Sequence, residues 1–83
     1  MPRYFFHTAD GGDDRDEDGI ELHSHDAARK EAIRYLGEVL SHEPDTLWDG
    51  RDFRVEVTNE DGELLFTILT LAVDSPAARK PPR

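Results

Sequence analysis

The sequence contains no cysteine, and this absence removes three kinds of site at once. Without a thiol there is no disulfide framework, no thiolate metal centre and no cysteine nucleophile. A glycine-rich phosphate cradle is missing as well, because the adjacent glycines Gly11 and Gly12 stand among aspartates, which have the wrong charge for a phosphate. The chemistry left to the chain is that of carboxylates, imidazoles and hydroxyls.

Long apolar segments and basic side chains are also scarce. The longest apolar segment, LLFTILTLAV at 64–73, is about half as long as a membrane-spanning helix. Ten basic side chains against 19 acidic ones give a net charge of -9, which opposes binding to phosphate backbones and anionic membranes. The first residues lack the basic and apolar parts of a secretory signal. We therefore predict a cytoplasmic protein that binds neither nucleic acid nor membrane.

A chain of 83 residues has room for one compact domain and none for a separate catalytic domain. We place that domain at residues 1–73. Residues 74–83, DSPAARKPPR, are proline-rich and carry three of the ten basic side chains, so we predict a disordered basic tail.

The first half of the chain predicts two strands and a helix. The segment RYFFHT at 3–8 is typical of a strand, with Tyr4 and Phe6 on one face and Phe5 and His7 on the other. An acidic loop then leads to a short strand at about 19–22. From residue 27 onward apolar residues recur at helical spacing, behind an N-cap at Ser24, and Glu43-Pro44 is expected to end the helix. The members of this stripe are Ala28, Ala32, Leu36, Val39 and Leu40.

The second half predicts a β-hairpin. Apolar and polar residues alternate over 53–58, the turn NEDG follows at 59–62, and a return strand begins at Glu63. If the four turn residues form the loop, the pairs on the helix-facing side are Val57 with Leu64, Val55 with Phe66 and Phe53 with Ile68. Trp48, in the connection before the hairpin, is expected to cover one end of the core, the alternative being an exposed binding anchor. The predicted fold is α+β: ββαββ, an antiparallel sheet of three to four strands with one helix packed on one face.

Four short motifs in a fixed order resemble a family of small bacterial proteins that is known only as a domain of unknown function. They are MPRYFFH at 1–7, GIEL at 19–22, WDG at 48–50 and VEVTxEDG at 55–62. The resemblance covers residues 1–73 and implies a free-standing bacterial cytoplasmic domain. It implies no activity, cofactor or catalytic residue.

The acidic segment raises the question of a metal site. Asp14, Asp16 and Asp18 have the spacing of the first three ligands of an EF-hand calcium loop, and Gly19 stands where that loop turns. The twelfth position, where the loop needs a bidentate glutamate, is His25. We therefore favour a solvated acidic hairpin and no resident cofactor. Weak calcium binding through Asp14, Asp16, Asp18 and His25 remains the alternative.

Histidine and serine side chains suggest two further sites, and neither is favoured. His23 and His25 beside Asp26 could bind zinc or nickel only with a ligand from another segment, for which His7 is the candidate. The string Ser24-His25-Asp26 imitates a catalytic triad, but successive helical residues point in different directions. The sequence therefore predicts a protein that is not an enzyme.

An apolar row on the outer face of the return strand favours self-association. Leu65, Leu69 and Leu71 point away from the predicted helix and lie opposite polar positions of the partner strand. We predict that these leucines, with Phe5, form a two-fold homodimer interface, the alternative being cover by the first strand or the tail. The favoured function is a non-enzymatic, acidic protein-interaction module, with a basic protein as a further candidate partner.

Overall fold

The computed structural model describes residues 1–9, 13–48 and 52–79, so the Gly11-Gly12 turn and most of the WDG motif lie outside the described residues. The strands are β1 (Arg3–Ala9), β2 (Asp13–Asp14), β3 (Ile20–Glu21), β4 (Phe53–Thr58) and β5 (Leu64–Thr70). One α-helix, α1 (His25–His42), separates β3 from β4, and a 3-10 helix, η1 (Pro76–Arg79), follows β5.

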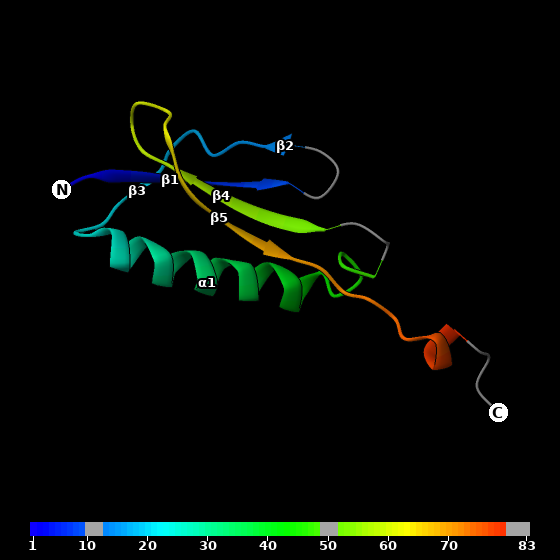
Figure 1. The fold of residues 1–83 in the computed structure, drawn as a ribbon. Coiled ribbons are helices and arrows are strands. Elements are labelled where there is room, and N and C mark those ends of the chain that lie inside the picture. Colours follow the sequence, from blue (N-terminus) through cyan, green and yellow to red (C-terminus); the bar gives the residue numbers. More distant parts are fainter. Residues whose placement is uncertain (10–12, 49–51, 80–83) are drawn as a thin grey trace.

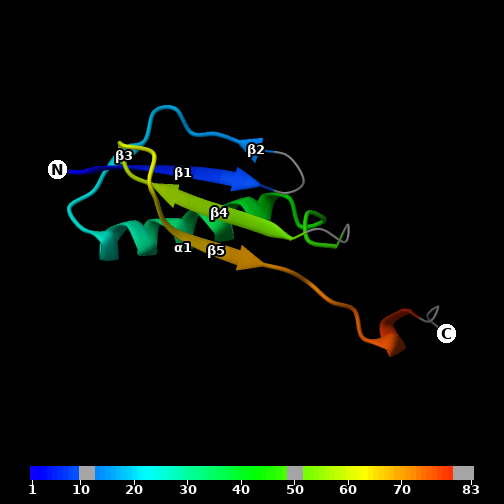
Figure 2. The same cartoon turned by 45° about the horizontal axis from the view of Figure 1, so that its top comes forward.

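The described strands form one antiparallel sheet with α1 across one face (Figure 1). The strand order is β2-β1-β4-β5, and β3 pairs with the other end of β1. A second view, turned by 45°, shows the helix running behind β4 and β5 (Figure 2). This arrangement confirms the predicted α+β class, with β2 as an additional two-residue strand.

Helix α1 begins and ends where its sequence predicts. The hydroxyl of Ser24 accepts a hydrogen bond from the backbone N–H of Ala27 at 3.0 Å, which satisfies one of the free N–H groups of the first turn. At the other end the N–H of Glu43 donates to the carbonyl of Val39, and Pro44 prevents a further turn. Among the described residues, no helix combines the length and the apolar character that crossing a membrane requires.

The core lies between α1 and the two central strands. Ala28 and Ala32 are completely buried, and their small side chains allow the helix to lie close to the sheet. The buried apolar residues of the cluster are Tyr4, Phe6, Ala28, Ala32, Leu36, Phe53, Val55 and Val57. Trp48 does not belong to it, because its side chain is 60% exposed; the neighbouring Leu47 packs against the core instead. The expectation that Trp48 covers the core is therefore wrong.

The hairpin closes with a shorter loop than the sequence predicts. The N–H of Asn59 donates to the carbonyl of Glu63, and the N–H of Gly62 donates to the carbonyl of Asn59, both at 3.1 Å. Gly62 has a φ of +79°, which glycine adopts without strain, and this permits a three-residue loop. Thr58 is therefore opposite Leu64, and not opposite Glu63.

A β-bulge then shifts the strands once more. The register changes between Val57 and Thr58, so that one residue of β5, Leu65, has no partner of its own. The pairs beyond the bulge are Val57 with Phe66, Val55 with Ile68 and Phe53 with Thr70, two positions from the predicted pairs. A shift of two keeps each side chain on its face, and Phe66 and Ile68 do pack against the core as predicted.

Candidate functional site: an acidic segment and an open sheet edge

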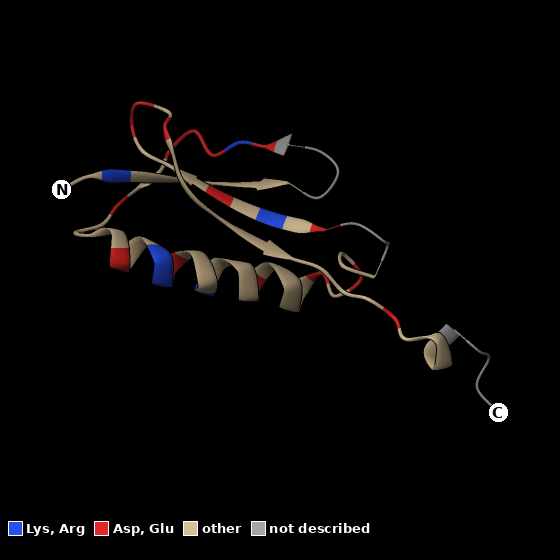
Figure 3. Ribbon diagram, in the orientation of Figure 1, with Lys and Arg blue, Asp and Glu red and all other residues tan. Residues whose placement is uncertain are grey.

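The acidic segment 13–21 covers the outer edge of β1. It pairs with β1 at one end through β2, where Thr8 is opposite Asp14, and at the other end through β3, where Tyr4 is opposite Ile20. Between these two contacts the segment leaves the strand geometry. The charge distribution in Figure 3 shows acidic residues along this segment and in the loop that joins β4 to β5.

The carboxylate of Asp16 replaces the missing strand pairing. One oxygen, Oδ2, accepts a hydrogen bond from the backbone N–H of Phe6 at 3.2 Å. This N–H lies on the edge of β1 and is not paired with another strand. The other, Oδ1, accepts the N–H of Asp18 at 3.0 Å and of Gly19 at 3.2 Å. Burial opposes ionisation of this side chain, but the three amide hydrogen bonds outweigh it together and lower the pKa of Asp16. The charged form of Asp16 therefore fastens the segment to the sheet.

His7 holds the same segment from the other side. Its buried ring accepts the N–H of Asp16 at Nδ1, at 3.0 Å, and Nε2 lies 3.0 Å from the hydroxyl of Thr58. Because Nδ1 is the acceptor, the proton belongs on Nε2, which then donates to Thr58. Both ring nitrogens are thus occupied, and His7 does not supply the additional ligand that a zinc or nickel site at His23 and His25 needs.

Gly19 is required at its position for two reasons. Its φ is +72°, a conformation that costs energy for any residue with a Cβ. A Cβ atom here would also lie 2.9 Å from Cγ of Arg3 and 2.9 Å from Cε2 of Phe5. A glycine at this turn therefore lets the segment lie against β1 without displacing Arg3 or Phe5.

The four predicted calcium ligands do not converge. Asp16 is engaged by backbone amides, whereas Asp14 and Asp18 are exposed. His25 lies at the start of α1, with its ring edge-on to Tyr4 at 5.7 Å between centroids. Within residues 1–9, 13–48 and 52–79, no group of three or more histidine, aspartate or glutamate side chains is arranged to hold a metal ion.

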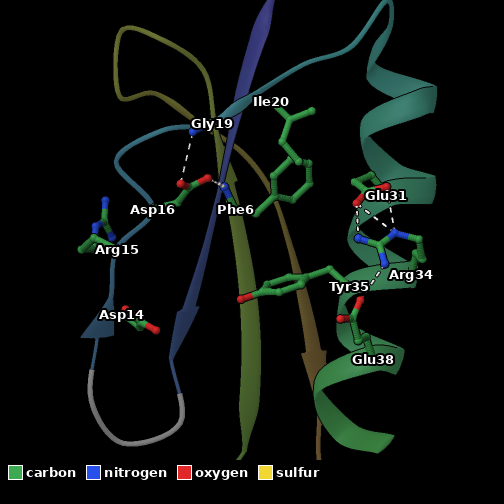
Figure 4. A pocket seen from close by; sticks show the side chains of 10 residues that line it. All are labelled: Phe6, Asp14, Arg15, Asp16, Gly19, Ile20, Glu31, Arg34, Tyr35 and Glu38. Carbon is green, nitrogen blue, oxygen red and sulfur yellow. Dashed lines mark hydrogen bonds and ion pairs between the residues drawn. The ribbon is translucent and has the colours of Figure 1, made fainter. Parts of the chain in front are cut away.

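A groove that the sequence does not predict lies between the acidic segment and α1 (Figure 4). It has a volume of about 450 Å³, and Phe6, Ile20 and Tyr35 contribute its apolar surface. Arg34 neutralises much of its acidic wall by binding Glu31 at 2.6 Å and Glu38 at 2.7 Å. Burial and the negative charges of Asp14, Asp16 and Glu38 raise the pKa of Tyr35. The two glutamates of the groove are thus paired within the chain, while the surroundings of Tyr35 stay negatively charged.

The opposite edge of the sheet, at β5, is open. Among the described residues β5 pairs with β4 alone, so one side of this seven-residue strand has free backbone N–H and carbonyl groups. Leu64, Leu69 and Leu71 are between 55% and 59% exposed. The three leucines and the open strand together form a surface that we call the β5 edge.

Two of the predicted interface residues lie elsewhere. Leu65 is half-buried and packs against the core, because the bulge reverses the alternation on which its outward orientation was predicted. Phe5 belongs to β1, is separated from β5 by β4, and its ring lies against Gly19. Of the four predicted residues, Leu69 and Leu71 lie at the β5 edge. Leu64 lies there too, although a register without the bulge would place it on the inner face.

Comparisons with known proteins agree with the resemblance seen in the sequence. No curated protein matches the chain. No solved structure matches it either. One family profile, described as Domain of unknown function (DUF6894), matches residues 3–72. A match over this much of the chain shows the family, and the protein is therefore a member of the DUF6894 family, a domain of unknown function.

Proposed function

We propose that this chain is a non-enzymatic interaction domain that acts as a homodimer, formed when the β5 edges of two copies pair antiparallel. One observation carries the proposal: the sheet has one covered edge and one open edge. The acidic segment covers β1 at both ends and in the middle, whereas β5 has no described neighbour beyond β4.

The sequence of β5 has few of the features that keep an open strand from pairing. Protected edges are short or carry charged side chains, prolines or bulges, and of these β5 has only the bulge at Leu65. β5 is LLFTILT, seven residues without charge or proline, and Leu64 and Leu69 extend its apolar surface into solvent. The bulge beside Leu65 leaves the five residues after it in regular strand geometry. Such a strand is suited to main-chain pairing with another strand.

The charge distribution favours a second copy as the partner at this edge. Residues 1–73 hold 18 of the 19 acidic side chains and 7 of the 10 basic ones, so two copies repel each other over most of their surfaces. That repulsion is smallest at the uncharged β5 edge. A two-fold axis places the β5 edge of one copy against the β5 edge of the other. The acidic segment stays exposed in such a dimer, where it would attract a basic protein (Figure 3).

Placing a charge on the β5 edge is expected to dissociate the dimer. In Leu69→Asp each copy presents a carboxylate to the apolar interface, and an unpaired charge is costly to bury. We expect the dissociation constant to rise by about 100-fold. Sedimentation equilibrium of the full chain over a concentration series measures it.

Ala77→Asp is the matched control, because it adds the same charge to an exposed position beyond the sheet. It should leave the dissociation constant unchanged. A wild-type chain that sediments as a monomer at tens of micromolar would refute the proposal, as would equal effects of the two substitutions.

Cation binding by residues 13–26 is the second candidate, and the Asp14-x-Asp16-x-Asp18 spacing is what favours it. We expect calorimetric titration with calcium to give no heat of specific binding, because Asp16 already accepts three backbone amides. A true site would raise the free energy of unfolding by about 2.7 kcal/mol at a hundredfold excess of calcium over the dissociation constant. A saturable titration that Asp16→Asn abolishes would establish this second function.

A further inference from the structure

We infer that the dimer has a second apolar core, formed on the helix side of the sheet by the α1 flanks of the two copies. This inference depends on the pairing of the β5 edges proposed above. It concerns residues on the helix side of the sheet: Ile33, Gly37 and Leu40 of α1, and Phe66 and Ile68 of β5.

The helix covers the sheet unevenly. Val55 and Val57 of β4 are completely buried beneath it. Phe66 and Ile68 share the inner face of the sheet with these valines, but they are only half-buried. The inner face of β5 is therefore only partly covered within one copy, although its side chains pack against the core.

The flank of α1 on the β5 side also carries apolar residues, which follow the exposed Arg29 in the first turns of the helix. Glu31, Arg34 and Glu38 line the groove against the acidic segment, so they define the opposite flank of the helix. Successive helical residues are about 100° apart, which places Ile33, Gly37 and Leu40 on the flank toward β5. Ile33 is 58% exposed. On this geometry the exposed Ile33 extends the apolar surface of the half-covered Phe66 and Ile68 from the strand onto the helix.

Gly37 supports the same conclusion. Glycine inside a helix is unfavourable by about 1 kcal/mol relative to alanine. A Cβ at Gly37 would meet nothing within 4 Å in this chain, so no contact within one copy requires the glycine. The open space at Gly37 is available to a partner helix.

The two-fold axis brings these elements together. α1 and β5 run in nearly the same direction (Figure 1), so antiparallel β5 strands bring antiparallel helices with them. If Ile33 of one copy lies against Leu40 of the other, the same offset places Lys30 opposite Glu43. Opposite charges then flank the apolar contact, and the two Gly37 residues lie near the axis.

A pair of identical substitutions on opposite sides of the molecule tests the inference. Ile33→Asp introduces a charge into the proposed second core, whereas Ile20→Asp introduces it beside the acidic segment, at the covered edge. We expect Ile33→Asp to raise the dissociation constant of the full-chain dimer at least about tenfold and Ile20→Asp to leave it unchanged. Sedimentation equilibrium provides both values.

Proximity can be measured directly because the chain contains no cysteine. Gly37→Cys, treated with a short bismaleimide, should give a covalent dimer, and Arg34→Cys on the groove flank should not. If Leu69→Asp dissociates the dimer but Ile33→Asp does not, the β5 edges pair but the second core does not exist. Equal cross-linking of the two cysteine variants would lead to the same conclusion. A monomeric wild-type chain would overturn both.

Discussion

Replacement of Asp16 with alanine is expected to lower the free energy of unfolding by about 2–3 kcal/mol. The substitution removes both carboxylate oxygens and leaves the N–H groups of Phe6, Asp18 and Gly19 without their acceptor. Hydrogen bonds to charged groups contribute about 1.5–3 kcal/mol each, and we discount the sum because the N–H of Asp18 is exposed. Urea denaturation of the full chain measures the loss.

The neighbouring aspartates are the controls. Asp14 and Asp18 are exposed, and their carboxylates accept no hydrogen bond from the described residues. Asp14→Ala and Asp18→Ala are expected to change the free energy of unfolding by less than about 0.5 kcal/mol. If all three alanine variants lose equal stability, Asp16 does not have the fastening role assigned to it.

The same carboxylate is expected to make stability depend on pH. The pKa of Asp16 is lower in the folded state than its ordinary value of about 3.9, so its contribution is fully present above that value. The contribution is lost as the pH falls through the folded pKa. The difference in unfolding free energy between wild type and Asp16→Asn should therefore shrink below about pH 4. A difference that stays constant down to pH 2 would contradict the assignment.

Replacement of Gly19 with alanine is expected to lower the free energy of unfolding by about 2–5 kcal/mol. The positive φ accounts for about 1–2 kcal/mol of this. The remainder comes from the clash of the new Cβ with Phe5 and Arg3, because an overpacked contact costs about 1–3 kcal/mol. Thermal and urea unfolding of Gly19→Ala provide the measurement.

Gly62→Ala separates the two causes. Gly62 has a similar φ, +79°, but a Cβ there would meet nothing within 4 Å. Gly62→Ala is therefore expected to cost only the backbone part, about 1–2 kcal/mol. Equal losses at Gly19 and Gly62 would mean that the packing of Phe5 and Arg3 against Gly19 contributes nothing.

Local sequence signals predict the elements of this fold well. The N-cap at Ser24, the spacing of Ala28, Ala32 and Leu36, and the proline after the helix act within a few residues of one another, so they define α1 without knowledge of the rest. The alternation in β4 is equally local. The assignment of Phe66 and Ile68 to the inner face is correct even though the register is not, because the error was an even number of positions.

The features that position the candidate site are not local. The bulge at Leu65 exchanges the exposure of Leu64 and Leu65. Because both residues are leucine, the sequence does not indicate which of the two is exposed. The role of Asp16 as a hydrogen-bond acceptor for β1 could not be predicted, for a similar reason. Its spacing from Asp14 and Asp18 is visible in the sequence, but the N–H of Phe6 that it accepts belongs to a strand ten residues earlier.

The sequence by itself determined the class of fold, the helix and its limits, the inward faces of β4 and of β5 beyond its bulge, and the absence of thiol chemistry. Those properties follow from residue type and short-range periodicity, which act before the chain is compact. Only the tertiary structure decided which sheet edge is covered and which is open. That outcome depends on the hydrogen bond between the carboxylate of Asp16 and the backbone N–H of Phe6, and on the extra residue, Leu65, in β5. Both form only when the segments pack together.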